Sequence, residues 1–301
     1  MNIGILGIGA IGGLMASRLA NAANNIFCLG SKKSNKFIKD NGIFLRSNFY
    51  GEKRFFPISN FNKNVSLDYL FITVKGFMLE SALKDYKFLY NNETIAISLL
   101  NGIGHDKIIK KYFKQNYIIG SIGHVEVFTN TKNEIIHKSK HKPLVEISYN
   151  NESLKKHTQL IKNLVNTANI NCEIIEDQNL LIWRKLIRLC TISTITTISK
   201  SNIGFARTNE PFKSIMKNLI HELCQIAAKE NKIFDAAQIE ETINSLPEDL
   251  RTSMQKDIES NKKSEMEFIL GETLRKGNSY NLYLPMMSIC YSYLNVLVTN
   301  K

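Results

Sequence analysis

The sequence predicts an α/β chain of two domains: a doubly wound sheet domain over residues 1–174, then an all-helical domain over residues 175–301. Three observations support this prediction. The chain opens on a glycine-rich strand–turn–helix unit, strands and helices alternate through the first half, and no strand pattern follows Asp177. Such sheets bind ligands beyond the carboxyl ends of their strands, so polar residues at those ends are the first candidates for a site.

The opening unit is typical of dinucleotide binding. Asn2–Leu6 is a short apolar run that fits a buried parallel strand, and a second run, Asn25–Leu29, closes a βαβ unit of roughly 30 residues. Between them stands the motif Gly7-Ile8-Gly9-Ala10-Ile11-Gly12, followed by a helical pattern. In such a motif the first glycine allows a tight turn, the second lets a phosphate approach bare backbone, and the third lets helix and strand pack closely. These six residues are therefore predicted to bind a pyrophosphate at the start of the helix, as in a Rossmann-type domain. The alternative is a glycine-rich turn without a ligand.

The end of the second strand bears on the choice of cofactor. An NAD site usually places an acidic residue about 20 residues beyond the glycines, where it binds the ribose 2′-hydroxyl. This chain has Ser31, Lys32 and Lys33 there instead, and one hydroxyl with two ammonium groups suits a 2′-phosphate. The sequence therefore predicts NADPH rather than NADH, against the alternative of a solvated basic loop.

Composition limits the class of protein. Lysine and arginine exceed aspartate and glutamate by 39 − 27 = 12, but the lysines are spread along the chain and no nucleic-acid motif appears. A positive field also attracts an anionic substrate and NADP. The five cysteines are widely spaced, which indicates free thiols in a reducing compartment and no metal site. Without a signal peptide or an apolar run of about 18 residues, the sequence predicts a cytoplasmic protein that binds neither membrane nor nucleic acid.

Strands alternate with helices through the rest of the first half. The expected strands are Ile43–Leu45, Leu67–Lys75, Thr94–Leu100, Tyr117–Gly120 and Leu144–Ile147, and the expected helices are Met78–Lys84 and His105–Phe113. One strand ends at Lys75 and another ends just before Asn101. Because of this placement, both residues are candidates for a ligand site.

The second half reads as a series of helices. We expect helices over Leu180–Ser199, from Glu210-Pro211, after Ser253, over Ser264–Lys276 with a stop at Gly277-Asn278, and after Pro285, with a break at Asn244–Pro247.

One lysine of the most apolar helix stands out. Helical spacing places Lys185, Leu189 and Ser193 on one stripe. A lysine that is partly removed from water has a lowered pKa, which suits it to donate a proton. The alternative from spacing alone is a lysine whose ammonium group reaches the helix surface.

Ordered blocks along essentially the whole chain resemble the ketopantoate reductases. These blocks are the opening glycine unit, Ile72–Lys75, Asn101–Gly104, Trp183–Leu186, Thr252–Asp257 and Ser264–Gly271. The resemblance implies a Rossmann domain followed by a helical domain. It also implies the NADPH-dependent reduction of 2-dehydropantoate to pantoate, a step of pantothenate and coenzyme A biosynthesis.

The resemblance also implies roles for particular residues. Lys185 resembles the family's catalytic proton donor, and Glu265 resembles the acid that helps orient the substrate and the lysine. Asn101 is similar to the asparagine that lies by substrate and cofactor, and Lys75 to the lysine near both ligands. Ser253 resembles a substrate-binding serine, for which the alternative is an ordinary helix cap.

Two positions depart from the family pattern. Where many members carry asparagines four and eight residues after the catalytic lysine, this chain has Leu189 and Ser193. The serine keeps one hydrogen-bonding group for the substrate, whereas the leucine keeps none, which favours a less polar keto acid.

Two further functions stay open: a reductase of another 2-oxo acid or imine, and a non-enzymatic dinucleotide sensor. A sensor needs neither Lys185 nor Glu265. The expected partner is a small anionic 2-oxo acid, and a homodimer is left open.

Overall fold

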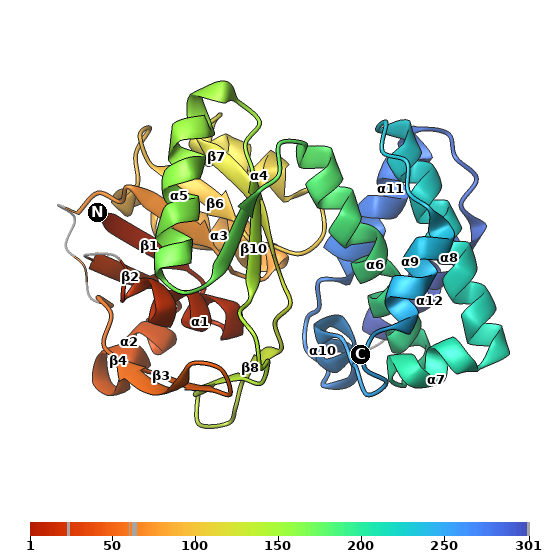
Figure 1. The fold of residues 1–301 in the computed structure, drawn as a ribbon, viewed down its shortest axis with the longest axis horizontal. Coiled ribbons are helices and arrows are strands. Elements are labelled where there is room, and N and C mark those ends of the chain that lie inside the picture. The colour runs from red at the N-terminus through yellow and green to blue at the C-terminus, as the bar shows by residue number, and fades with distance from the viewer. Residues whose placement is uncertain (23–24, 60, 62–64, 300–301) are drawn as a thin grey trace. The chain divides into compact units, whose positions relative to one another are not determined.

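The fold was obtained as a computed structural model that describes residues 1–22, 25–59, 61 and 65–299 (Figure 1). The chain forms two compact units. Unit 1 comprises Met1–Leu100 and His105–Leu181, and unit 2 comprises Asn101–Gly104 and Ile182–Lys301. The short segment Asn101–Gly104 therefore belongs to unit 2, although both of its flanking segments belong to unit 1.

Unit 1 is built on a seven-stranded sheet. In spatial order its strands are β11 (Asn171–Ile174), β10 (Leu144–Ser148), β7 (Tyr117–Gly123), β6 (Ile95–Ser98), β5 (Tyr69–Ile72), β1 (Asn2–Leu6) and β2 (Asn25–Leu29). In this sheet, neighbouring strands are parallel from β2 through β1, β5 and β6 to β7. β10 pairs with β7 in the antiparallel direction. This order confirms the predicted doubly wound, Rossmann-type domain, in which β1 and β5 lie side by side.

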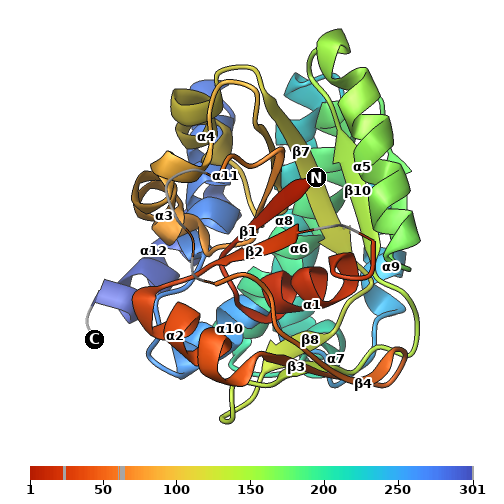
Figure 2. The same cartoon turned by 90° about the vertical axis from the view of Figure 1, so that its left-hand side faces the viewer.

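Helices cover both faces of this sheet, which explains why its strands are apolar throughout. Figure 2 shows α1 (Ala10–Leu19) and α5 (Lys155–Thr167) on one side of the sheet, with α3 (Leu79–Asp85) and α4 (His105–Phe113) on the other. Alternate residues of each strand accordingly enter two separate apolar clusters: Ile3 and Ile5 join one, and Leu6 joins the other.

Several elements of unit 1 have no clear sequence signal. The segment after Gly30, for which a solvated basic loop was the alternative, is the start of helix α2 (Lys32–Asn41), so its conformation is helical, and Lys32 and Lys33 are exposed there. A second sheet is formed by β4 (Gly51–Phe55), β3 (Ile43–Ser47), β9 (Ile135–His137) and β8 (Val127–Thr129), in that order. β4 has four exposed residues in a row, so it lacks the alternation on which a strand prediction depends.

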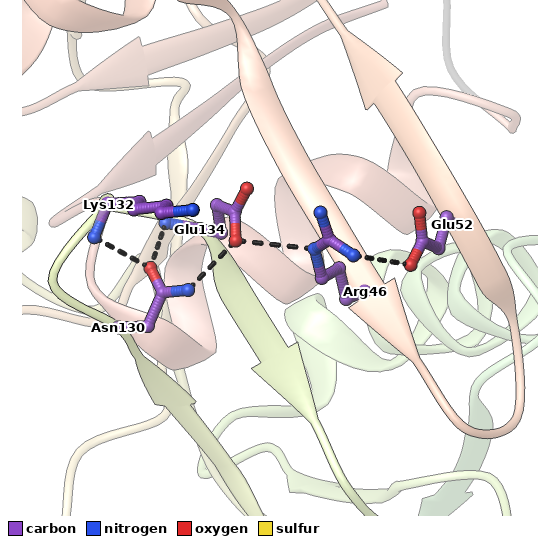
Figure 3. Close-up of polar contacts among 5 residues, drawn as sticks. All are labelled: Arg46, Glu52, Asn130, Lys132 and Glu134. Atoms are coloured by element: carbon purple, nitrogen blue, oxygen red, sulfur yellow. Dashed lines mark hydrogen bonds and ion pairs between the residues drawn. The ribbon is translucent and has the colours of Figure 1, made fainter.

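A polar network joins the strands of the second sheet (Figure 3). The Arg46 guanidinium donates to Glu52 at 2.7 Å and to Glu134 at 3.3 Å. The Asn130 side chain donates to the Glu134 carboxylate at 2.8 Å and accepts from the backbone amides of Lys132 and Glu134. The hydrogen bond from Asn130 and the charge of Arg46 lower the pKa of Glu134. The network thus fixes the tight turn between β8 and β9 with local contacts.

Unit 2 is helical, as predicted. Its helices are α6 (Gln178–Ser199, which begins in unit 1), α7 (Ile203–Thr208), α8 (Glu210–Lys229), α9 (Ala236–Asn244), α10 (Ser253–Glu259), α11 (Glu272–Ser279) and α12 (Pro285–Thr299). A π-helical turn, η4 (Glu267–Gly271), directly precedes α11.

The predicted stop at Gly277 is wrong, because α11 continues to Ser279 and Gly277 lies buried inside it. A Cβ at Gly277 would lie 2.3 Å from the Leu284 side chain, so this glycine permits close packing.

Within the part of the chain that the structure describes, no helix is both long and apolar enough to span a membrane.

Candidate functional site

The glycine turn after β1 has the backbone that a phosphate-binding turn needs. Gly7 has φ +94°, a region that favours glycine, and its N–H donates to the Leu29 carbonyl at 2.9 Å. A Cβ at Gly12 would lie 1.9 Å from the Gly7 carbonyl oxygen. Thr73 Oγ1, which sequence reasoning did not single out, donates to that same oxygen at 2.8 Å. A hydroxyl residue directly after a buried strand was the available signal for Thr73.

Gly9 differs from the two glycines around it because it is open. A Cβ built there meets no atom within 4 Å, and Gly9 is the N-cap of α1 without any side-chain cap. The first N–H groups of a helix lack partners inside the helix and carry its positive dipole end. This turn therefore offers an anion bare backbone with donors behind it, which fits a dinucleotide pyrophosphate.

Ser31, Lys32 and Lys33 lie at the start of α2, beside the glycine turn, because β2 pairs with β1. The Ser31 hydroxyl accepts from the Ser34 amide at 3.1 Å and caps the helix, while Lys32 and Lys33 are exposed in its first turn. Lysines in a first turn oppose the helix dipole, so helix stability does not account for them. Together with the N-terminus of α1 at Gly9, which no side chain caps, they form a surface that suits a phosphate group.

Asn35 of α2 and Tyr86, which follows α3, brace this corner. Asn35 accepts from the Gly30 amide at 2.9 Å and donates to the Tyr86 hydroxyl at 2.7 Å. Tyr86 in turn donates to the Gly30 carbonyl.

Lys75 follows β5 and precedes the short 3₁₀ turn η1 (Gly76–Met78), where it is partly buried. Because β2, β1 and β5 are adjacent and parallel, all the predicted cofactor residues except Asn101 follow neighbouring strands.

Lys185 lies on α6 in unit 2 and is partly buried. Burial lowers its pKa to about 8; the negative charge of Glu265 opposes this shift and the positive charge of Arg188 adds to it. Desolvation therefore outweighs the carboxylate. A lysine with this pKa is charged at neutral pH and releases a proton more readily than an ordinary lysine.

Glu265 and Asn101 complete a polar group with Lys185. The Glu265 side chain is only 4% exposed, and the Asn101 amide donates to its carboxylate over a long 3.5 Å. All three residues belong to unit 2. An ammonium donor, a carboxylate and an amide thus lie in one polar group, which is able to bind a polar substrate and transfer a proton to it.

The α6 stripe that contains Lys185 continues through Leu189 to Ser193. Ser193 is 1% exposed, and its hydroxyl has no hydrogen-bond partner among the described residues. Leu189 is partly buried and packs against the apolar cluster of unit 2. The stripe therefore changes from charged to apolar and then to a buried hydroxyl within two turns.

Ser253 is the first residue of α10 and is exposed. The residue that caps α10 is Thr252, whose side chain accepts from the Gln255 amide at 3.3 Å. The alternative of Ser253 as a helix cap is therefore wrong.

Comparisons with known proteins agree with this architecture. A family model described as ketopantoate reductase PanE/ApbA matches residues 3–150, and one described as ketopantoate reductase PanE/ApbA C terminal matches residues 177–298. The oxidoreductase YkpB of Bacillus subtilis (strain 168) is 25% identical over 304 residues, which cover 99% of each chain. The 2-dehydropantoate 2-reductase of Lactococcus lactis is 26% identical, over 100% of this chain and 98% of the relative.

Solved structures share the fold. D-mandelate dehydrogenase in a ternary complex with NADH and anilino(oxo)acetate superposes with a TM-score of 0.89 at 23% identity, over 100% of this chain and 99% of the other. A dimeric ketopantoate reductase from Staphylococcus aureus superposes with a TM-score of 0.85 at 20% identity, over 100% and 99%. The fold and the relatives define an oxidoreductase with a Rossmann-type domain followed by a helical domain. The chain belongs to the ketopantoate reductase PanE/ApbA family.

Proposed function

We propose that this chain is an NADPH-dependent 2-dehydropantoate 2-reductase that forms pantoate. The observation that carries the proposal is the group of Lys185, Glu265 and Asn101 in unit 2, with the Lys185 pKa lowered to about 8. These are the residues that a carbonyl reduction requires: a donor for the carbonyl oxygen, and polar groups that hold the substrate.

We assign cofactor binding to residues 1–174 and substrate binding and proton transfer to residues 175–301 with Asn101. The open backbone at Gly9 and the basic start of α2 fit NADPH, which when bound supplies the hydride. Lys185 donates its proton to the oxygen of the C2 carbonyl and so neutralises charge that develops there. Glu265 and Asn101 hold a polar group of the substrate, and Ser253 binds its carboxylate.

The preference for NADPH over NADH is testable at the start of α2. Replacing both Lys32 and Lys33 with glutamate should raise the KM for NADPH at least about tenfold, because hydrogen bonds to a charged phosphate are lost. The KM for NADH should change much less. A matched control replaces Lys36 and Lys39, two exposed lysines of the same helix, and changes the net charge equally. Equal use of both cofactors by the parent would contradict the assignment.

A second candidate function is favoured by Leu189. This side chain lies one helical turn from Lys185 and brings no hydrogen-bonding group to the α6 stripe. The alternative substrate is thus a 2-oxo acid with an apolar side chain. D-mandelate dehydrogenase, solved with NADH and anilino(oxo)acetate, shares this fold.

One assay separates the two candidates. NADPH oxidation is measured with 2-dehydropantoate and with 3-methyl-2-oxobutanoate, which lacks only the hydroxymethyl group. We expect the higher kcat/KM with 2-dehydropantoate. A higher value with 3-methyl-2-oxobutanoate or with an aromatic 2-oxo acid would support the second candidate, and no turnover with any of them would contradict both.

We further propose that the protein is a homodimer. The dimeric relative from Staphylococcus aureus supports this, as does the outer face of α12, where Ile289, Tyr293 and Val296 form an exposed apolar row on a helix without charged residues. In a chain of net charge +12, a charge-free face is where a second copy meets least repulsion. Sedimentation equilibrium should give twice the chain mass of 34.3 kDa, and the chain mass itself would exclude the dimer.

A further inference from the structure

We propose that Gly102 is a positioning residue: it lets the loop Asn101–Gly104 dock onto the π-helical turn η4, and this docking holds the Asn101 amide at the Glu265 carboxylate. The inference rests on the proposed function, because it assigns Asn101 and Glu265 to the handling of an oxo acid. It adds a structural device to that site, built from the backbone of two segments that lie far apart in the chain.

The π register of η4 changes which amide reaches the Phe268 carbonyl. In an α-helix the N–H of Glu272 would donate to Phe268, four residues earlier. Here that N–H donates to the Glu267 carbonyl, five residues earlier, and the Phe268 carbonyl accepts from the Ile103 N–H at 2.9 Å. π-helical turns are rare and frequently lie at functional sites. The turn thus presents an acceptor to the loop three residues after Glu265.

Gly102 is the residue that permits this docking. Its φ is +85°, and a Cβ built on it would lie 2.2 Å from the Phe268 carbonyl oxygen and 2.5 Å from the carbonyl carbon. These are backbone atoms, which cannot turn aside as the end of a side chain would. Any larger residue therefore pushes the loop off the turn and displaces Asn101, the residue just before it.

The turn is held from its other side. The Glu267 carboxylate pairs with Arg275 and accepts from the Tyr291 hydroxyl at 2.8 Å. Arg275 also pairs with Glu272 at 3.0 Å, so the first residue of η4 and the residue that follows the turn share one guanidinium. These contacts hold the Glu267 side chain at the start of the turn whose Phe268 carbonyl accepts from the loop.

The matched pair of variants is Gly102→Ala and Gly51→Ala. Both positions have positive φ, +85° and +75°, but a Cβ at Gly51 meets no atom within 4 Å. The two substitutions thus carry similar backbone strain, and only Gly102→Ala breaks a contact. We expect Gly102→Ala to lower kcat/KM for the oxo acid by about 10²-fold with unchanged NADPH affinity, and Gly51→Ala to resemble the parent. In an Asn101→Ala background, Gly102→Ala should add little, because it acts through Asn101.

Hydrogen exchange at the Ile103 amide tests the docking without any activity. Exchange should be slow in the parent and in Gly51→Ala, and fast in Gly102→Ala. If Gly102→Ala does not fold, Glu267→Gln replaces it, since loss of the Arg275 pair should also speed exchange at Ile103. Unchanged exchange at Ile103, or equal kcat/KM in the two glycine variants, would overturn the inference. A parent that reduces no oxo acid would instead overturn the proposed function, while the exchange result still decides the docking.

Discussion

Replacing Lys185 with alanine is expected to lower kcat for the oxo acid by roughly 10²–10⁴-fold, the usual contribution of a positioned acid. Among the three residues of this polar group, Lys185 carries the proton suited to the carbonyl oxygen, while Glu265 contributes a carboxyl group and Asn101 an amide. NADPH affinity should stay near the parental value, because the glycine turn and α2 belong to unit 1. Steady-state NADPH oxidation, after a check of folding by circular dichroism, gives the result.

The control for this variant is Lys229→Ala. Lys229 is an exposed lysine at the end of α8, so its removal changes the net charge in the same way. A near-parental kcat for Lys185→Ala would remove Lys185 as the acid and leave Lys75 as the next candidate.

The second large effect is expected at the glycine turn. Gly9→Val should abolish measurable NADPH binding while leaving the thermal midpoint unchanged. The backbone there is extended and a Cβ meets no atom within 4 Å, so the first carbon of a side chain is accommodated and the valine methyl groups project into the space that we assign to the phosphate. Isothermal titration with NADPH and a thermal melt measure the two quantities.

Gly12→Val provides the contrast. A Cβ at Gly12 would lie 1.9 Å from the Gly7 oxygen, so this variant should lose stability as well as cofactor binding. Normal NADPH binding by Gly9→Val would show that the phosphate lies elsewhere.

The N-terminal fold was predictable because its signals are local. The strand at Asn2–Leu6, the glycine motif and the strand at Asn25–Leu29 each follow from neighbouring residues, and the structure confirms all three. The helix around Lys185 was equally clear. By contrast, β4 is almost fully exposed and α2 opens with polar residues, so neither carries an apolar period that a sequence would reveal.

The arrangement of the candidate site was less predictable, because it depends on contacts between distant segments. Asn101 and Glu265 are 164 residues apart in the chain, and only the resemblance suggested that they share a site. The π register of η4 has no sequence signature here, and it is in this register that the Phe268 carbonyl accepts from the Ile103 N–H. Gly277 shows the opposite error: a glycine read as a helix stop is a packing position.

The pH dependence of kcat/KM for the oxo acid tests the central claim, that Lys185 is the proton donor, most directly. A donor is active only when protonated, and kcat/KM reports the ionisation of the free enzyme. Since burial lowers the Lys185 pKa to about 8, kcat/KM should be constant at neutral pH and fall roughly tenfold per pH unit above that value. A profile that stays flat up to about pH 10, where an ordinary lysine titrates, would contradict the account.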